Sequence, residues 1–192
     1  FTQPHGGGGP GAGAVMVSQR LVEFLPDPIV TKIKDNFDLT KPSKSIGKMG
    51  AFHGNFGALV RAYAYIRTLG KEGINSISED AVINANYLRT KLENTLDLPY
   101  NRICSHEVVF SAKTIKEKYG VNALDISKRL IDYNIHPPTM YFPLIVDEAL
   151  LVEPTETESK ETLDDFIYVI KQIVDEAKTD PELLHNAPHN TP

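Results

Sequence analysis

The sequence predicts an α+β fold in which a short antiparallel sheet is backed by helices. Two observations support this prediction. After about residue 100, the local patterns follow one another in the order strand, helix, strand, strand, helix. In addition, the 192 residues are 41% hydrophobic and 23% charged, which is typical of a globular chain long enough for one domain plus an arm.

Residues 99–192 are expected to form the α+β domain. The sequence HEVVFSA at 106–112 favours a strand, and 123–133 favours an amphipathic helix with apolar Leu124, Ile126, Leu130 and Ile131. Further strands are expected at 141–142, 144–146 and 149–152, although nearby prolines limit how central they can be. Ser159 or Thr157 then caps a last helix, whose apolar face holds Leu163, Phe166, Ile167, Ile170, Ile173, Val174 and Ala177.

Residues 51–98 are expected to form two long connecting helices. The first, FGALVRAYAYIRTLG, follows His53 or Asn55 and is apolar nearly all round, which indicates burial. Gly70 supplies its stop. A capping-box pattern at 76–79 predicts the start of the second helix, with Ala81, Ala85, Leu88 and Leu92 on one stripe.

Residues 1–50 are expected to form a Gly-rich arm and an irregular segment. Six of the 13 glycines fall within the first 13 residues. A short strand is expected at 15–17, and Ser18 is expected to cap a short helix that ends at Leu25. Residues 26–50 are polar and rich in turn-forming residues, so they are interpreted as a surface segment.

The net charge, the length of the apolar runs, and the cysteine and histidine patterns argue against several classes of partner and site. The net charge of −5 disfavours nucleic acid, because phosphate binding needs a basic face. No apolar run approaches the roughly 18 residues of a membrane span, so no membrane partner is expected. The single cysteine, Cys104, cannot form an internal disulfide, which fits a cytoplasmic location. His185 and His189 lack the surrounding pattern of a metal site, so no metal is expected.

The run Gly6–Gly9, within FTQPHGGGGPGAG, allows two interpretations. Glycine permits positive φ and a close approach of another group to the backbone, so the run can cradle a phosphate or carboxylate. It matches neither the P-loop nor the dinucleotide-binding pattern. The alternative is a flexible or tightly curved linker, and the residues by themselves leave both interpretations open.

Three long motifs give the chain a resemblance to a known family. They are FTQPHGGGGPGAG, HGNFGALVRAYAYIRTLG and HPPTMYFPLIVDEALLVEPTETESKETLDDFI, followed by the tail PELLHNAPHNTP. Together they resemble glycine dehydrogenase (decarboxylating), the P-protein of the glycine cleavage system. The similarity covers essentially the whole chain and is greatest to the C-terminal part of subunit 2 of the two-subunit form.

The resemblance implies a fold and a cofactor. The family uses pyridoxal 5′-phosphate (PLP) on the α/β fold of the aspartate aminotransferase superfamily, of which this chain would supply mainly the C-terminal α+β small domain. The lysine that holds the cofactor as a Schiff base is expected two residues before Phe1. No catalytic residue is therefore expected within this chain, and the fragment by itself is expected to be inactive.

The resemblance also implies a reaction and partners. The parent enzyme would decarboxylate glycine and pass the aminomethyl group to the lipoyl arm of H-protein, with the cofactor as electron sink. Expected partners are P-protein subunit 1, a second copy of the chain, lipoylated H-protein and glycine. Within this chain, the arm residues Thr2, His5, Gly6, Gly7, Gly8 and Gly9 are candidates for cofactor binding or for the active-site loop. Arg61, His136 and Thr139 are candidates for substrate contacts.

Two alternatives stay open beside this interpretation. The chain could be another PLP enzyme of the same superfamily, such as an aminotransferase or a cysteine desulfurase. It could also be a non-catalytic α+β module that only assembles with a partner subunit. For the isolated chain, apolar surface is expected to be exposed around residues 58–66, which predicts self-association.

Overall fold

The computed structural model describes residues 11–50 and 54–189. The chain divides between Lys71 and Glu72 into two units, each of which has its own internal contacts. The boundary follows Gly70, which interrupts the helical segment α1 (Phe56–Leu92) with φ 64° and ψ −170°. These dihedral angles are not helical, so α1 consists of two helices joined at Gly70. The conformation is accessible essentially to glycine only. The predicted helix stop at Gly70 is confirmed, and the division into 1–50, 51–98 and 99–192 stays a prediction.

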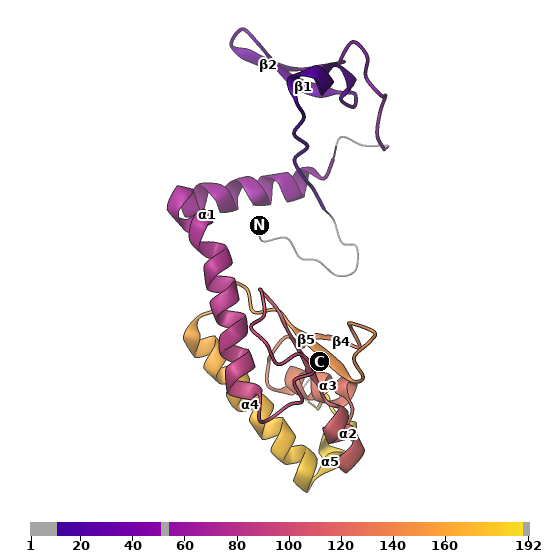
Figure 1. The fold of residues 1–192 in the computed structure, drawn as a ribbon, viewed down its shortest axis with the longest axis vertical. Helices are drawn as coiled ribbons and strands as arrows, with labels where there is room; N and C mark the ends of the chain where they lie inside the picture. The colour runs from indigo at the N-terminus through magenta and orange to yellow at the C-terminus, as the bar shows by residue number, and fades with distance from the viewer. Residues whose placement is uncertain (1–10, 51–53, 190–192) are drawn as a thin grey trace. The chain divides into compact units, whose positions relative to one another are not determined.

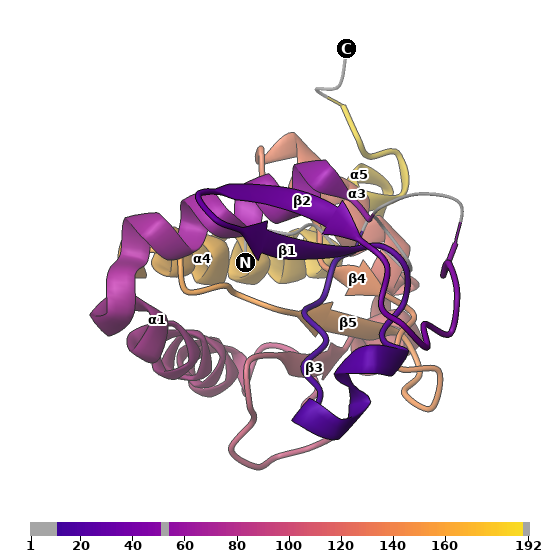
Figure 2. The same cartoon turned by 90° about the horizontal axis from the view of Figure 1, so that it is seen from above.

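The first unit contains a hairpin that the sequence analysis did not predict. Strand β1 (Ile29–Ile33) pairs antiparallel with β2 (Asn36–Thr40), in a register that runs from Ile29 opposite Thr40 to Ile33 opposite Asn36. Figure 2 shows the two arrows side by side. The expectation of an irregular segment at 26–50 is therefore wrong in its middle.

A short 3₁₀ helix, η1 (Gln19–Phe24), precedes the hairpin where a short helix was expected. Ser18 lies just before it, but its side chain makes no capping hydrogen bond, so the predicted cap is wrong. Residues 15–17 do not form the expected strand. Val15 and Met16 are exposed, so no burial favours an extended pairing there.

The second unit contains the expected antiparallel sheet. Its strands are β3 (Val108–Ser111), β4 (Thr139–Met140) and β5 (Ala149–Val152), in the spatial order β3-β5-β4. The predicted strands at 106–112 and 149–152 are thus confirmed. The expected strands at 141–142 and 144–146 are wrong, because these residues form a loop between β4 and β5.

Helices surround this sheet in the second unit (Figure 1). The long helix α4 (Lys160–Thr179) contacts α2 (Lys113–Tyr119), α3 (Ala123–Asp132) and α5 (Pro181–His185). Both α3 and α4 were predicted, and their amphipathic patterns place them. The shorter helices α2 and α5 were missed, since one or two turns give too few residues for a periodic signal.

Local hydrogen bonds explain where these helices begin and end. Asn122 Oδ1 accepts from the backbone N–H of Asp125, while Asp125 Oδ2 accepts from the N–H of Asn122, which makes a capping box for α3. Gly120 closes α2 with φ 77°. Ser159 Oγ accepts from the N–H of Thr162 at 3.2 Å, which confirms the predicted cap of α4.

The capping box predicted at residues 76–79 is wrong. The chain is already helical through this stretch, and Ser76 Oγ instead donates to the carbonyl of Gly73 at 3.1 Å. A serine within a helix commonly forms such a bond to the preceding turn. The expected stripe is confirmed further along, because Ala85, Leu88 and Leu92 are buried.

The core of the second unit lies between its sheet and its helices. On one face of the sheet, Phe110 is paired with Leu150, and Val108 with Val152. All four side chains are buried, together with the α4 residues Leu163, Ile167, Ile170, Ile173, Val174 and Ala177. On α3, Ile126 and Leu130 point inward as expected, while Leu124 and Ile131 are exposed.

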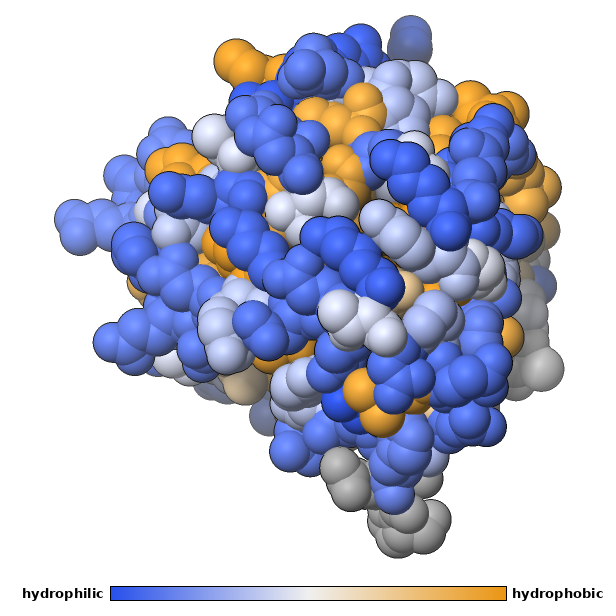
Figure 3. Space-filling model, turned by 90° about the horizontal axis from the view of Figure 1, so that it is seen from below, coloured by the Kyte–Doolittle hydropathy of each residue, from blue (hydrophilic) through white to orange (hydrophobic). Residues whose placement is uncertain are grey.

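The described surface gives no indication of a membrane span. No helix among the described residues is long and apolar enough to cross a bilayer. Figure 3 shows a mostly hydrophilic face on which apolar groups are small and separate. Scattered apolar groups of this kind are normal on protein surfaces.

Candidate functional site

The candidate residues of the N-terminal arm cannot be placed. Thr2, His5, Gly6, Gly7, Gly8 and Gly9 lie outside the described residues. Their assignment to the active-site loop stays a prediction.

Arg61 lies on the first half of α1 and is exposed. The apolar side chains of the same helix are exposed as well: Phe56, Leu59, Val60, Tyr63 and Ile66. The burial that the apolar pattern indicates is therefore absent in this chain. The expectation of exposed apolar surface around 58–66 is confirmed, although Ala58 itself is buried.

The structure separates the two other candidates. His136 is exposed and lines a cavity of about 610 Å³, which we call the His136 cavity. Thr139 lies three residues further on in β4, opposite Leu151, and does not line this cavity. The segment HPPT thus brings His136 into a concave site and places Thr139 on a sheet edge.

Both apolar and acidic side chains line the His136 cavity. Leu88, Val152 and Leu163 line it with buried side chains. Three carboxylate residues also line it: Glu153, Glu158 and Asp165. Like charges repel, so this arrangement favours an apolar or cationic group and opposes a phosphate or carboxylate.

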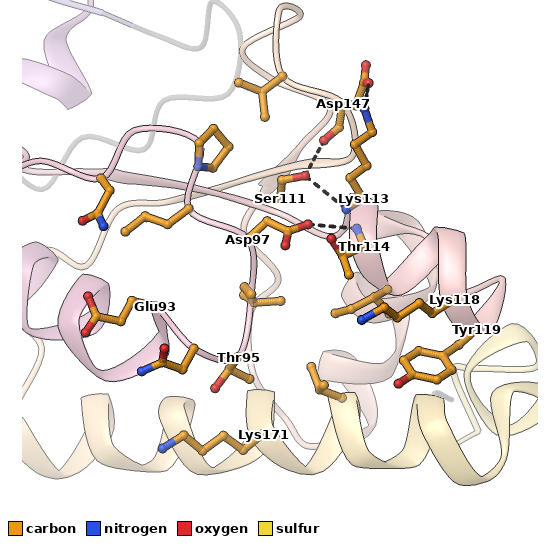
Figure 4. Close-up of a pocket in the computed structure, with 18 of the residues that line it drawn as sticks. Glu93, Thr95, Asp97, Ser111, Lys113, Thr114, Lys118, Tyr119, Asp147 and Lys171 are labelled. Atoms are coloured by element: carbon orange, nitrogen blue, oxygen red, sulfur yellow. Dashed lines mark hydrogen bonds and ion pairs between the residues drawn. The ribbon is translucent and has the colours of Figure 1, made fainter.

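A larger cavity of about 1020 Å³ lies between the end of α1, α2 and α4, and we call it the polar cavity (Figure 4). Asp97 Oδ2 accepts from the backbone N–H of Thr114 at 2.8 Å. Ser111 Oγ donates to the carbonyl of Asp147 at 2.7 Å, and Lys113 Nζ lies 3.1 Å from Asp147 Oδ2. These bonds fix one edge of the cavity.

Sequence reasoning missed the polar cavity. Much of its wall comes from residues 93–101, a connection without regular periodicity. A β-bridge between Asp97 and Ser111 ties this connection to β3. Nothing in the linear pattern reveals such a bridge, because it depends on the pairing of an irregular segment with a strand end.

An ion-pair cluster joins α3 to α4. Arg129 contacts Glu176 through two hydrogen bonds, and Tyr133 Oη donates to Glu176 Oε1 at 2.7 Å. Burial opposes ionisation of Glu176, but the bonds from Arg129 and Tyr133 outweigh it and hold the pKa of this carboxyl below its usual range. Burial and the bond to Glu176 raise the pKa of Tyr133. Every charge in the cluster is paired, so it is a structural brace.

Two histidines near the C-terminus pair with carboxylates of α3. His185 Nδ1 lies 3.2 Å from Asp125 Oδ2, and His189 Nδ1 lies 2.9 Å from Asp132 Oδ2. Among residues 11–50 and 54–189, no group of three or more His, Cys, Asp or Glu side chains could hold a metal ion. The two pairs connect His185 and His189 to α3.

Comparison with known proteins places the chain in a family. Residues 77–189 match the family model described as the C-terminal domain of glycine dehydrogenase. The whole chain is 53% identical to a protein of Thermotoga maritima named probable glycine dehydrogenase (decarboxylating) subunit 2. The chain belongs to the glycine dehydrogenase family. Its resemblance to this family is thereby confirmed, including the assignment to subunit 2.

Relatives with the same name occur in other bacteria. The chain is 53% identical to the protein of Listeria monocytogenes and 52% identical to that of Kosmotoga olearia, in each case over its full length. It spans about 40% of the length of these curated relatives. The chain thus corresponds to only a part of each relative, and the matching family model describes a C-terminal domain.

Solved structures confirm the fold class. A glycine decarboxylase (P-protein) of the glycine cleavage system, in an inhibitor-bound form, aligns with TM-score 0.60 and 17% identity over 81% of this chain and 37% of that one. The apo cysteine desulfurase of Thermococcus onnurineus aligns with TM-score 0.55 and 16% identity, over 83% and 42%. The predicted α+β fold of the small domain is thus confirmed.

Proposed function

We propose that this chain is the C-terminal part of a PLP-dependent glycine decarboxylase, which releases CO2 from glycine and passes the aminomethyl group to the lipoyl arm of H-protein. The observation that supports it most is the 53% identity over the whole chain to proteins named subunit 2 of glycine dehydrogenase. The competing assignment to a cysteine desulfurase rests on a likeness of 16% identity, which concerns the fold only.

The partners follow from the same assignment. A protein named subunit 2 implies a subunit 1, and we propose that the chain joins subunit 1 and a second copy of itself in a cytoplasmic hetero-oligomer. Glycine and lipoylated H-protein are the proposed substrate and acceptor.

The described residues do not form a PLP site. PLP needs a lysine for covalent attachment, donors for its phosphate and a carboxylate at its pyridine nitrogen. No lysine lines the His136 cavity, and its three carboxylates oppose a phosphate. In the polar cavity, Lys113 and Lys178 pair with Asp147 and Asp175.

The two remaining lysines of the polar cavity do not change this conclusion. Lys118 and Lys171 are exposed, whereas a lysine that attaches a carbonyl cofactor is typically desolvated. We therefore propose that the attachment lysine lies before Phe1 and that the 192 residues by themselves are inactive.

His136 is the described residue that we propose for a role in the complete active site. It is exposed and lies in the motif HPPTMYFP, which carries the resemblance to the family, so it is proposed as a substrate contact. Arg61 and Thr139 are proposed as further substrate contacts, since both are exposed. The same proposal extends to Thr2, His5 and the glycines 6–9.

The test is H-protein-dependent exchange of CO2 with the carboxyl group of glycine. It uses the full-length protein that contains these residues, together with subunit 1. We expect exchange with glycine and no sulfur release from cysteine. His136→Asn should lower the exchange rate at least about tenfold.

The matched control is His189→Asn, because His189 is also exposed and pairs with Asp132, which does not line the His136 cavity. It should leave the exchange rate unchanged. Transamination or desulfuration without exchange would overturn the assignment. Equal effects of the two substitutions would remove His136 from the site.

A further inference from the structure

The loop between β4 and β5 presents four large apolar side chains to solvent. Leu144 is 86% exposed, Ile145 82%, Phe142 55% and Tyr141 42%. We call the segment 141–145 the apolar tip. A single exposed apolar residue needs no explanation, but four within five consecutive positions concentrate apolar surface of the kind that marks an interface.

The base of this loop is fixed by the surrounding elements. Glu148 Oε2 accepts from the backbone N–H of Ala123 at 2.9 Å, and its carboxylate also pairs with Lys116. The carbonyl of Glu148 accepts from the N–H of Ala112 at 3.0 Å. Ala112 at the start of α2, Lys116 within α2 and Ala123 at the start of α3 therefore all hold the C-terminal side of the loop.

The tip itself contains two further backbone bonds. The N–H of Tyr141 donates to the carbonyl of Ala149 at 2.9 Å, and the N–H of Val146 donates to the carbonyl of Pro143 at 3.0 Å. A surface loop fixed in this way loses little conformational entropy when a partner covers it. Such preorganised apolar side chains are suited to anchor an interface.

The charges around the tip indicate what kind of partner fits. Lys113 pairs with Asp147, and Lys116 pairs with Glu148, while Glu117 lines the same surface beside the tip. The border therefore has three acids and two bases, and it offers no electrostatic attraction to a nucleic acid or to an anionic membrane surface. The tip therefore fits an apolar protein surface.

We propose that the apolar tip docks on the part of the polypeptide that precedes residue 1 in the full-length protein. This inference rests on the proposed function, because it takes the chain as the C-terminal part of a longer one. The relatives match this chain over its whole length but over only 40% of their own, so their remaining 60% can supply the covering surface. Covalent linkage gives that surface a high effective concentration at the tip.

The experiment is hydroxyl-radical footprinting read by mass spectrometry at each side chain. It compares the full-length protein with the 192-residue chain. Phe142, Leu144 and Ile145 should be modified several-fold more slowly in the full-length protein. Ile103 is the matched control, because it is 81% exposed but lies outside the tip. Its modification rate should be the same in both proteins.

Equal modification of the tip in both proteins would overturn the proposal. Protection in the 192-residue chain that increases with its concentration would also overturn it, because the occupant would then be a second copy. The footprint does not depend on activity. A protected tip in a protein without CO2 exchange would refute only the proposed function, and an unprotected tip in an active enzyme would refute only the docking.

As a second readout, Leu144→Asp should lower the melting temperature of the full-length protein and leave that of the 192-residue chain unchanged. An equal effect on both would mean that Leu144 stabilises the second unit itself, which its exposure does not support.

Discussion

Arg129 on α3 donates two hydrogen bonds to Glu176 on α4, from Nε to Oε2 at 2.9 Å and from Nη2 to Oε1 at 3.0 Å. The third nitrogen, Nη1, donates to Asp132 at 3.0 Å. The side chains of Arg129 and Glu176 are 13% and 20% exposed, so the pair is largely shielded from water. The planar fork of arginine matches the carboxylate in a way that lysine cannot.

Removal of this pair should destabilise the second unit. Arg129→Ala leaves a poorly hydrated carboxylate without its cation, so the free energy of unfolding should fall by about 3 kcal/mol. Arg129→Lys should recover only part of this, because it cannot form both bonds. The control is Lys178→Ala, since Lys178 pairs with Asp175 at the exposed surface and should shift the urea midpoint little. Equal midpoints for the Arg129 and Lys178 variants would contradict the prediction.

Acid should weaken the same brace. The pKa of Glu176 is lower in the folded chain than in the unfolded chain, so the unfolded state binds the proton more readily. The resulting stabilisation is complete above the unfolded carboxyl pKa of about 4.3, and it disappears as the pH falls through the lower folded pKa. Urea unfolding measured between neutral and acid pH should show this loss. Glu176→Gln should make the curve flatter in the acid range, and an unchanged slope would argue against the assignment.

Gly120 should tolerate asparagine better than alanine. Its φ of 77° is left-handed, and an added Cβ would meet nothing within 4 Å, so the effect is one of backbone strain without a clash. Gly120→Ala should cost about 1 kcal/mol of folding free energy, and Gly120→Asn should cost less, because asparagine enters this region more readily. Thermal unfolding of the two variants gives the comparison. The reverse order would mean that something other than φ decides.

The 192-residue chain should self-associate through the first half of α1. Tyr63 is 67% exposed and Val60 48%, and Phe56, Leu59 and Ile66 in the same half of the helix are exposed too. Burial of such surface against a second copy is favourable. Light scattering should therefore show a mass above that of the monomer, which increases with concentration. Val60→Glu with Tyr63→Glu should restore the monomer, and a wild-type chain that is monomeric at all concentrations would contradict the prediction.

Periodic elements could be predicted from the sequence, and short ones could not. Helix α4 spans 20 residues, so its apolar stripe repeats often enough to fix its existence and its inward face. The hairpin of β1 and β2 turns through Lys34 and Asp35, which is not one of the usual glycine-containing turn pairs. Most of its side chains are exposed, so it lacks the alternation of a half-buried strand as well.

Only those candidate residues that belong to a recognisable motif could be predicted from the sequence. His136 was identified by the motif HPPTMYFP, and the structure places it at a cavity. Thr139 belongs to the same motif but lies in a strand edge, because three residues of extended chain separate the two positions. The polar cavity arises from contacts between segments far apart in sequence, which no local pattern can report.

The hairpin of the first unit has a consequence for the life of the chain in the cell. A two-stranded sheet is barely stable by itself, and Val30, Ile33, Phe37 and Leu39 in this one are exposed. A surface that binds the folded hairpin would therefore stabilise it, because binding to the folded state shifts the equilibrium away from the unfolded state. In the hetero-oligomer proposed above, a copy that has not assembled should be cut first by proteases within 29–40, while the second unit resists. Turnover would then remove unassembled copies and spare assembled ones, which would keep the amounts of the proposed subunits matched.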